Sequence, residues 1–181
     1  NKEDHYLLKQ FHKHNKRYRE LAGIEFNEKT VQRWERTEKY LSDFISEKYN
    51  LEDISLVRID RDFIVDFEHF LKVNKGNGKN TSSKYLENLK KIIKAAHDNN
   101  IIKINPFNGV KLGKVKAKRI PLNEMELKQI MNTAINIDRL DIVRDCFVFC
   151  CFTGLSFTDA FALKADNIHM DQYGQYWIYI N

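Results

Sequence analysis

Two residues with chemically capable side chains, Ser156 and Asp159, follow an apolar run of the sequence. The run, residues 146–152, stops at a Thr-Gly pair, and the chain turns apolar again after Asp159. The Ser156 hydroxyl can donate one hydrogen bond but carries no charge. Both residues also have structural explanations, because Ser156 can cap a helix that begins at Phe157 and Asp159 can interact with the dipole of that helix. The residue types alone leave open whether Ser156 and Asp159 have a chemical role or only a structural one.

A second group of chemically relevant residues consists of lysines and arginines. Between Lys72 and Ile120 the sequence has 13 Lys or Arg and two acids, so this segment carries +11 while the whole chain carries only +5. The remaining residues therefore carry −6. A basic segment in a mildly acidic chain is typical of proteins that bind the phosphate backbone of nucleic acids. The alternative is a lysine-rich surface that is merely solvated.

The cysteines and histidines predict neither a metal site nor a disulfide framework. Cys146, Cys150 and Cys151 lie within six positions, among Phe and Val, and the six histidines show no ligand spacing with them. We expect buried, reduced cysteines and hence a cytoplasmic protein. No apolar run approaches the roughly 18 residues of a membrane span. With 43% hydrophobic and 30% charged residues, the 181-residue chain has the composition of a soluble globular protein.

Four amphipathic helices are predicted in the first part of the chain, at 4–22, from about Thr30, at 60–73, and from residues 81–83 to 99–100. In the fourth helix, Thr81, Ser82 and Ser83 are candidates for the N-cap, and Lys84, Asn88 and Lys91 share an outer stripe. The inward-facing residues of the second, third and fourth helices are predicted to be Val31, Trp34, Leu41, Phe44 and Ile45, then Phe63, Ile64, Phe67, Phe70 and Leu71, and finally Tyr85, Leu86, Leu89, Ile92, Ile93 and Ala96.

The only two prolines, Pro106 and Pro121, bracket a basic segment without acids, FNGVKLGKVKAKRI. This composition predicts an interdomain linker over 109–120, between a helical domain at 1–108 and a second domain at 121–181. In the second domain, Asn123 is expected to cap a helix, and an apolar helix is expected over 138–152. The alternating, aromatic-rich segment QYGQYWIYIN predicts a strand.

This order of parts resembles the tyrosine recombinases, or phage integrases, across nearly the whole chain. The most specific match is CFVFCCFTGLSFTDAFALKADNI, in which Thr153, Gly154, Leu155, Asp159 and Leu163 stand at the family's positions. The sequence of this segment is similar to those of integrases from mobile elements in Bacteroidetes. The resemblance implies a mainly α fold: an N-terminal helical core-binding (SAM-like) bundle, a linker along the DNA, and the start of a mixed α/β catalytic domain.

At one catalytic position the sequence departs from the pattern of the family that it resembles. The family places a catalytic arginine directly after Thr-Gly-Leu, to hold the scissile phosphate, and this chain has Ser156 there. Either another basic residue serves or catalysis is lost; Arg144, twelve residues earlier, is a poor substitute. The Bacteroidetes subgroup tolerates loss of this arginine, which favours an active enzyme. Asp159 matches the family's supporting acid, whose carboxylate orders basic groups of the active site.

The family's remaining catalytic groups, including the nucleophilic tyrosine, lie downstream of Asn181. Tyr173, Tyr176 and Tyr179 precede those elements and are expected to be strand residues. The resemblance therefore implies that this chain is a fragment that does not cleave DNA by itself. In the full protein, the family's tyrosine forms a 3′-phosphotyrosyl bond without a required cofactor or metal, and a tetramer exchanges strands at paired att-type sites.

The expected contribution of this chain is binding of double-stranded DNA. The candidate residues are Lys79, Thr81, Ser82, Ser83, Lys84, Asn88 and Lys91 around the fourth helix, and Lys114, Lys116, Lys118 and Arg119 in the linker. Two other functions stay open. One is a catalytically inactive DNA-binding relative, and the other is a helical scaffold with no DNA role.

Overall fold

The structure is a computed structural model that describes residues 5–113, 115–116 and 118–180. It divides into two compact units, Asn1–Ala117 and Lys118–Asn181. The division falls inside the segment that the sequence assigned to the linker. Each unit is described here by itself.

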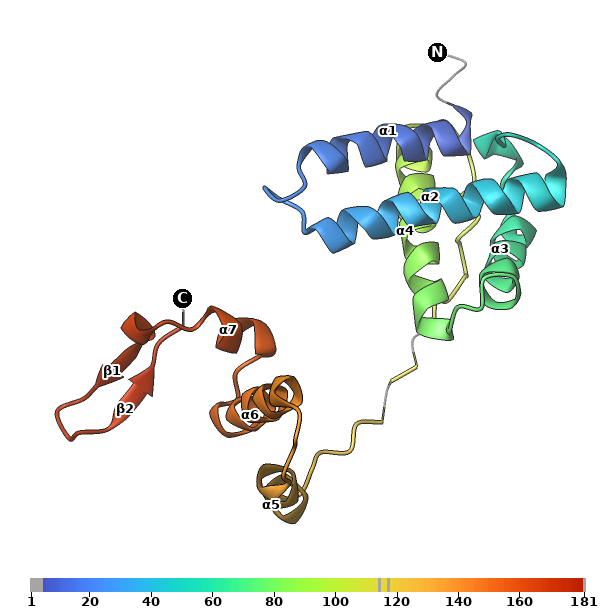
Figure 1. The fold of residues 1–181 in the computed structure, drawn as a ribbon. Helices are drawn as coiled ribbons and strands as arrows, with labels where there is room; N and C mark the ends of the chain where they lie inside the picture. Colours follow the sequence, from blue (N-terminus) through green and yellow to red (C-terminus); the bar gives the residue numbers. More distant parts are fainter. Residues whose placement is uncertain (1–4, 114, 117, 181) are drawn as a thin grey trace. The chain divides into compact units, whose positions relative to one another are not determined.

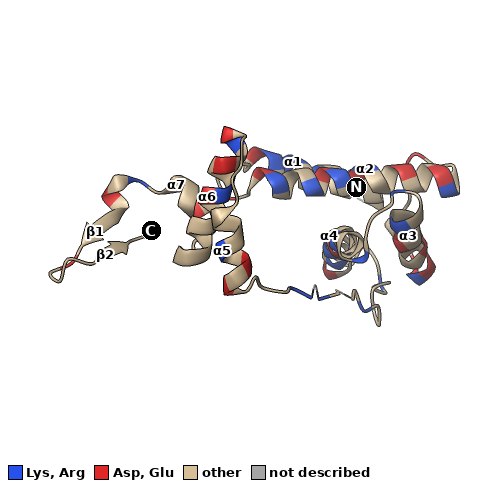
Figure 2. Ribbon diagram, turned by 60° about the horizontal axis from the view of Figure 1, so that its bottom comes forward, with Lys and Arg blue, Asp and Glu red and all other residues tan. Residues whose placement is uncertain are grey.

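The first unit is a bundle of the four predicted helices, α1 (Leu7–Glu20), α2 (Glu28–Tyr49), α3 (Arg61–Val73) and α4 (Lys79–Asp98). A short 3-10 helix, η2 (Leu56–Arg58), connects α2 to α3. Helix α1 packs along α2, and α4 runs crosswise on this pair and contacts α3 (Figures 1 and 2). The mainly helical fold expected from the sequence is therefore confirmed.

The core of the bundle is built from the predicted inward faces of α2, α3 and α4. Every residue predicted for these faces is buried, and Leu7 and Phe11 of α1 join them. Thr37 interrupts the apolar stripe of α2 in the sequence but is also fully buried. Its hydroxyl donates a hydrogen bond to the Arg33 carbonyl at 2.7 Å. A polar residue whose hydrogen bonds are satisfied can occupy a core position.

Polar side chains fix where the helices begin. Asn27 caps α2 by accepting from the Lys29 N–H, and Asp60 caps α3 by accepting from the Phe63 N–H at 2.9 Å. The prediction for α4 was wrong: the helix begins at Lys79 with Gly78 at the N-cap, before Thr81, Ser82 and Ser83. These three residues lie inside the first turns of α4 instead of capping it.

The chain after α4 continues to pack on the bundle. Ile102 and Phe107 are buried, and Val110 and Leu112 pack against the core. The first part of the segment that the sequence assigned to the linker therefore lies on the first unit. Apolar side chains at alternate positions among its lysines account for this packing.

The second unit contains α5 (Glu124–Asn132), α6 (Asp138–Thr153), α7 (Phe157–Ala162), a 3-10 helix η3 (Ala165–Asn167) and the strands β1 (Ile168–Met170) and β2 (Tyr176–Ile178). The predicted cap is confirmed, because Asn123 and Glu126 form a reciprocal capping box. The strands pair antiparallel, with His169 opposite Trp177. Sequence reasoning predicted β2 but missed β1.

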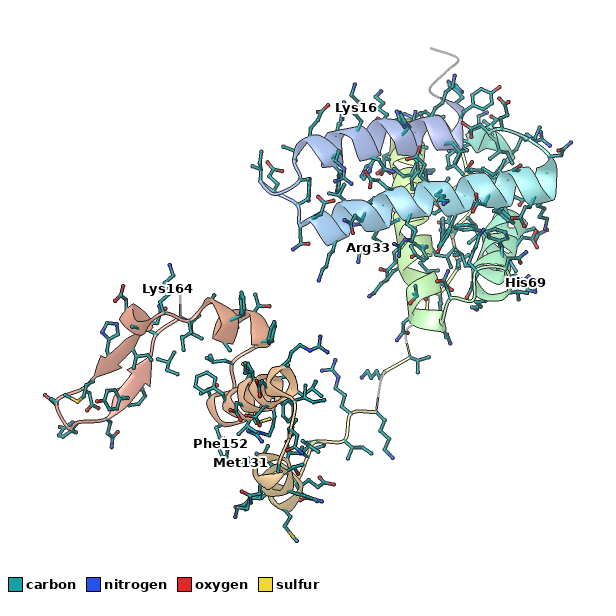
Figure 3. All side chains as sticks on the ribbon, viewed as in Figure 1. Lys16, Arg33, His69, Met131, Phe152 and Lys164 are labelled. Carbon is teal, nitrogen blue, oxygen red and sulfur yellow. The ribbon has the colours of Figure 1, made fainter. Side chains whose placement is uncertain are left out.

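None of the described residues from 118 to 180 is buried. The prediction of buried cysteines was therefore wrong for this structure: Cys146 and Cys151 are exposed, and Cys150 is half-buried. The second half of α6, from Cys146 to Phe152, is a continuous apolar run, and the other described residues of the second unit cover it only in part. Figure 3 shows Phe152 and Met131 among the side chains of this unit; both are exposed.

Candidate nucleic-acid interface

A shallow groove between α2 and α4 is lined by four basic side chains. Its volume is about 300 Å³, and it is lined by Lys29, Gln32, Arg33 and Arg36 of α2 and by Thr81, Lys84 and Tyr85 of α4. We call it the α2–α4 groove. No acid is among its described lining residues, and its four cations form no ion pair with a described carboxylate. These cations therefore remain available for an anionic partner.

The groove is basic because α2 separates its charges by face. Figure 2 shows basic and acidic residues along the same helix. The acids Glu28 and Glu35 face α1, where they bind the Arg19 guanidinium at 2.6 and 2.5 Å and raise its pKa. Arg33 extends from α2 on the side of α4 (Figure 3), and its buried Nε has no hydrogen-bond partner among the described residues. The face of α2 toward α4 is thus left with uncompensated positive charge.

A buried hydrogen-bond relay holds the two walls of the groove together. The Asn88 side-chain amide donates to the Thr37 hydroxyl at 2.9 Å, and that hydroxyl donates to the Arg33 carbonyl. Asn88 is only 4% exposed. The sequence placed Asn88 on the outer stripe of α4 as a DNA contact; the structure corrects this, because the side chain is used inside the bundle. Its role is to fix α4 against the part of α2 that carries Arg33.

Replacement of Asn88 is expected to destabilise the bundle. Asn88→Ala removes the amide from the relay and leaves a small cavity, so the free energy of unfolding should fall by about 1–3 kcal/mol. Urea denaturation measures this. Asn99→Ala is the matched control, because Asn99 is the C-cap residue of the same helix, is exposed, and donates one side-chain hydrogen bond to the Ala95 carbonyl. Equal stabilities of the two variants would contradict the relay.

Two more predicted DNA contacts are also buried. Ser82 is fully buried and Ser83 is 2% exposed. The Ser83 hydroxyl donates to the Gly113 carbonyl at 3.0 Å, so it holds the following segment of the chain. Neither serine can reach a ligand at the surface. By contrast, Lys79, Thr81 and Lys84 are exposed, and Thr81 and Lys84 line the groove.

Lys91 lies next to an aromatic cluster at the edge of the bundle. Its ammonium is 5.5 Å from the centre of the buried Trp34 ring, which also contacts His14 at 4.0 Å between ring centres. Burial lowers the pKa of His14, and the positive charge of Lys91 acts in the same direction. Lys91 itself is exposed. Trp34 thus positions a cation that the solvent can reach, and the DNA contact of Lys91 stays a prediction.

The predicted linker cations fall in both units. Lys116 is exposed in the first unit, and Lys118 and Arg119 are exposed in the second. Lys114 lies outside the described residues. Sequence reasoning missed Lys29, Arg33 and Arg36, although their spacing along α2 places them on one helical face.

The Ser156 and Asp159 side chains bond each other at the start of α7. The Ser156 hydroxyl lies 2.6 Å from an Asp159 carboxylate oxygen, and the Asp159 N–H donates to the same hydroxyl at 3.2 Å. Ser156 is therefore the N-cap of α7, one of its two interpretations. Arg144 bonds Asp141, Asp145 and the Thr133 carbonyl, so its guanidinium is already occupied between α5 and α6.

The described part of the chain has no cluster of three or more His, Cys, Asp or Glu placed to hold a metal ion. Among the same residues, no helix has both the length and the apolar character that crossing a membrane requires.

Comparison with known proteins identifies the first unit. Residues 6–117 match the phage integrase SAM-like domain. No curated protein and no solved structure matches the chain. The matched residues cover the four-helix bundle, the α2–α4 groove and the segment that follows α4. The chain therefore belongs to the phage integrase, or tyrosine recombinase, family and carries the SAM-like domain of that family at its N-terminal side.

Proposed function

We propose that the first unit binds double-stranded DNA for site-specific recombination, with the α2–α4 groove as its principal contact. The observation that carries this proposal is the set of four cations in the groove that pair with no described carboxylate. Their charge matches that of the phosphate backbone, which supplies most of the affinity in sequence-independent binding. Arg33 and Arg36 can each donate two parallel hydrogen bonds to one phosphate or to a guanine edge.

The remaining cations extend this surface along the chain. Lys79 is on the first turn of α4, and Lys116 follows on the segment that packs beside that helix. With the four groove cations, they make six groups able to neutralise phosphates. Lys91, Lys114, Lys118 and Arg119 are proposed as further backbone contacts. A tetramer on paired att-type sites is the proposed assembly of the full protein.

The second unit is proposed to be the first part of the catalytic domain, with Asp159 as a supporting acid. Ser156 can offer a phosphate at most a weak contact, because its hydroxyl already bonds the Asp159 carboxylate. This observation, with the occupied guanidinium of Arg144, also favours a second candidate: a DNA-binding relative that does not cleave. Incubating the full-length protein with a nicked duplex distinguishes the two, since only a recombinase forms a covalent phosphotyrosyl adduct.

Fluorescence anisotropy with a labelled 30-base-pair duplex of random sequence tests DNA binding directly. At 0.1 M salt we expect a Kd between about 1 and 100 µM, the usual range for sequence-independent binding. An unlabelled duplex should compete, whereas the uncharged polymer dextran should not. No binding at 100 µM protein would overturn the proposal and favour the scaffold interpretation.

A further inference from the structure

The side chain of Asn80 holds the segment that leaves the first unit. Its amide donates to the Val115 carbonyl at 2.9 Å, and its carbonyl oxygen accepts from the Val115 N–H at 2.8 Å. One side chain thus satisfies both backbone groups of a residue 35 positions later. The pattern is that of a hydrogen-bonded pair in an antiparallel sheet, with a carboxamide in place of one strand.

Two neighbouring contacts continue this attachment. The Ser83 hydroxyl, one turn further along α4, donates to the Gly113 carbonyl at 3.0 Å. The Lys79 side chain lies over Gly113, where an added Cβ would be 3.5 Å from Cε of the lysine. Gly113 and Val115 are therefore held at the N-terminal turns of α4, by the first residues of the helix that also lines the α2–α4 groove.

The chemistry of this attachment requires a carboxamide. A side chain that bonds both the N–H and the C=O of one residue must donate and accept at the same time, at a separation that matches the peptide. Asp offers only acceptors, and Ser has a single oxygen. An exposed backbone otherwise bonds water with little preference for direction, so the two bonds to Val115 select one orientation of its peptide groups. That orientation also sets the direction of the next residue, Lys116.

We propose that Asn80 is a positioning residue for DNA binding: it holds Val115 so that Lys116 continues the basic surface of Lys79 and Lys84. This inference rests on the proposed DNA binding of the first unit. Ser83 serves the same purpose from inside the bundle. Because Ser83 is 2% exposed and cannot touch DNA, any effect of Ser83 on affinity must pass through the held segment.

The test compares Asn80→Ala, Ser83→Ala and the control Asn99→Ala with the unchanged 181-residue chain. NMR hydrogen exchange of the Val115 N–H reports the attachment, and duplex anisotropy across a salt series reports its consequence. In Asn80→Ala the exchange rate should rise at least roughly tenfold. One phosphate contact is worth about eightfold at 0.1 M salt, so Kd should rise roughly three- to eightfold and the log–log salt slope should weaken by about 0.5 to 0.9. Ser83→Ala should show the same changes, smaller in size, and Asn99→Ala none.

The possible outcomes separate this inference from the proposed function. If the unchanged chain binds the duplex and both variants bind equally well, the positioning role is overturned while DNA binding stands. An affinity loss in Asn80→Ala alone, with Ser83→Ala unaffected, would make Asn80 a direct contact and also overturn it. If the unchanged chain does not bind, the proposed function itself fails. Thermal unfolding of the bundle should be unchanged in Asn80→Ala, because Asn80 is an exposed helical residue.

Discussion

Replacing Arg33 and Arg36 together by Gln is expected to weaken binding of a random duplex up to about 60-fold at 0.1 M salt. Each lost phosphate contact is worth about eightfold at this concentration by release of counterions. Both arginines line the α2–α4 groove, and neither pairs with a described carboxylate, so the substitution removes charge without breaking an ion pair. Fluorescence anisotropy at equilibrium measures the change.

The matched control is the double variant Arg58→Gln/Arg61→Gln. These two arginines are exposed and lie in the same unit, but beyond the other end of α2, in η2 and at the start of α3. Both double variants lower the net charge by two. A general charge effect would weaken both equally, whereas the groove predicts a loss of less than about threefold in the control. Equal losses would contradict the groove as the principal contact.

Trp34→Ala is expected to have the largest effect on stability, a loss of about 3–5 kcal/mol in the free energy of unfolding. Trp34 is 1% exposed and packs against Phe11, His14 and Tyr18 of α1, with Lys91 over its ring. Small domains have only about 5–15 kcal/mol of stability, so much of the bundle's stability should disappear. Urea denaturation followed by circular dichroism measures it.

The chain contains its own control for this substitution. Trp177, the second of its two tryptophans, is 54% exposed in β2 of the second unit. Trp177→Ala removes the same side chain but should leave the unfolding of the first unit unchanged. A loss below about 1 kcal/mol in Trp34→Ala would show that Trp34 does not join α1 to the rest of the bundle.

The fold of the first unit was predictable because its helices are strongly amphipathic. The apolar positions of α2, α3 and α4 recur at helical spacing, and all of those predicted to face inward are buried. The start of α4 was not predictable in the same way. Thr81, Ser82 and Ser83 have the composition of a cap, but Gly78 caps the helix, and Ser83 bonds a segment 30 positions later. Such a long-range bond leaves no local signal.

The candidate site was only partly predictable, because charge was counted along the sequence instead of around the helix. Helix α2 contains five basic and five acidic residues, so its net charge is zero and does not indicate a basic surface. The positive face of α2 becomes evident only from the structure, in which Glu28 and Glu35 form ion pairs with Arg19 of α1 on another face. Asn88 was misplaced for a related reason: a polar residue between two lysines looks exposed, although its amide has a buried partner in Thr37.

In the second unit, the sequence predicted the helices and strands better than it predicted the burial of their side chains. The cap at Asn123, helix α6 and strand β2 are present, whereas the cysteines of α6 are not buried. Composition predicts that an apolar helix is covered, but not by which residues. The roles of Ser156 and Asp159 are open for the same reason, since their mutual hydrogen bonds account for both residues as a helix start.

The most direct test of the account is the salt dependence of duplex binding by the 181-residue chain. Six phosphate contacts, from Lys29, Arg33, Arg36, Lys79, Lys84 and Lys116, predict a slope of log Kobs against log salt near −5, at about −0.9 for each contact. The Arg33→Gln/Arg36→Gln variant should then weaken this slope by about 1.8, because two contacts are lost. A slope between 0 and about −1 for the unchanged chain would show that its basic surface does not bind the DNA backbone, and would contradict the account.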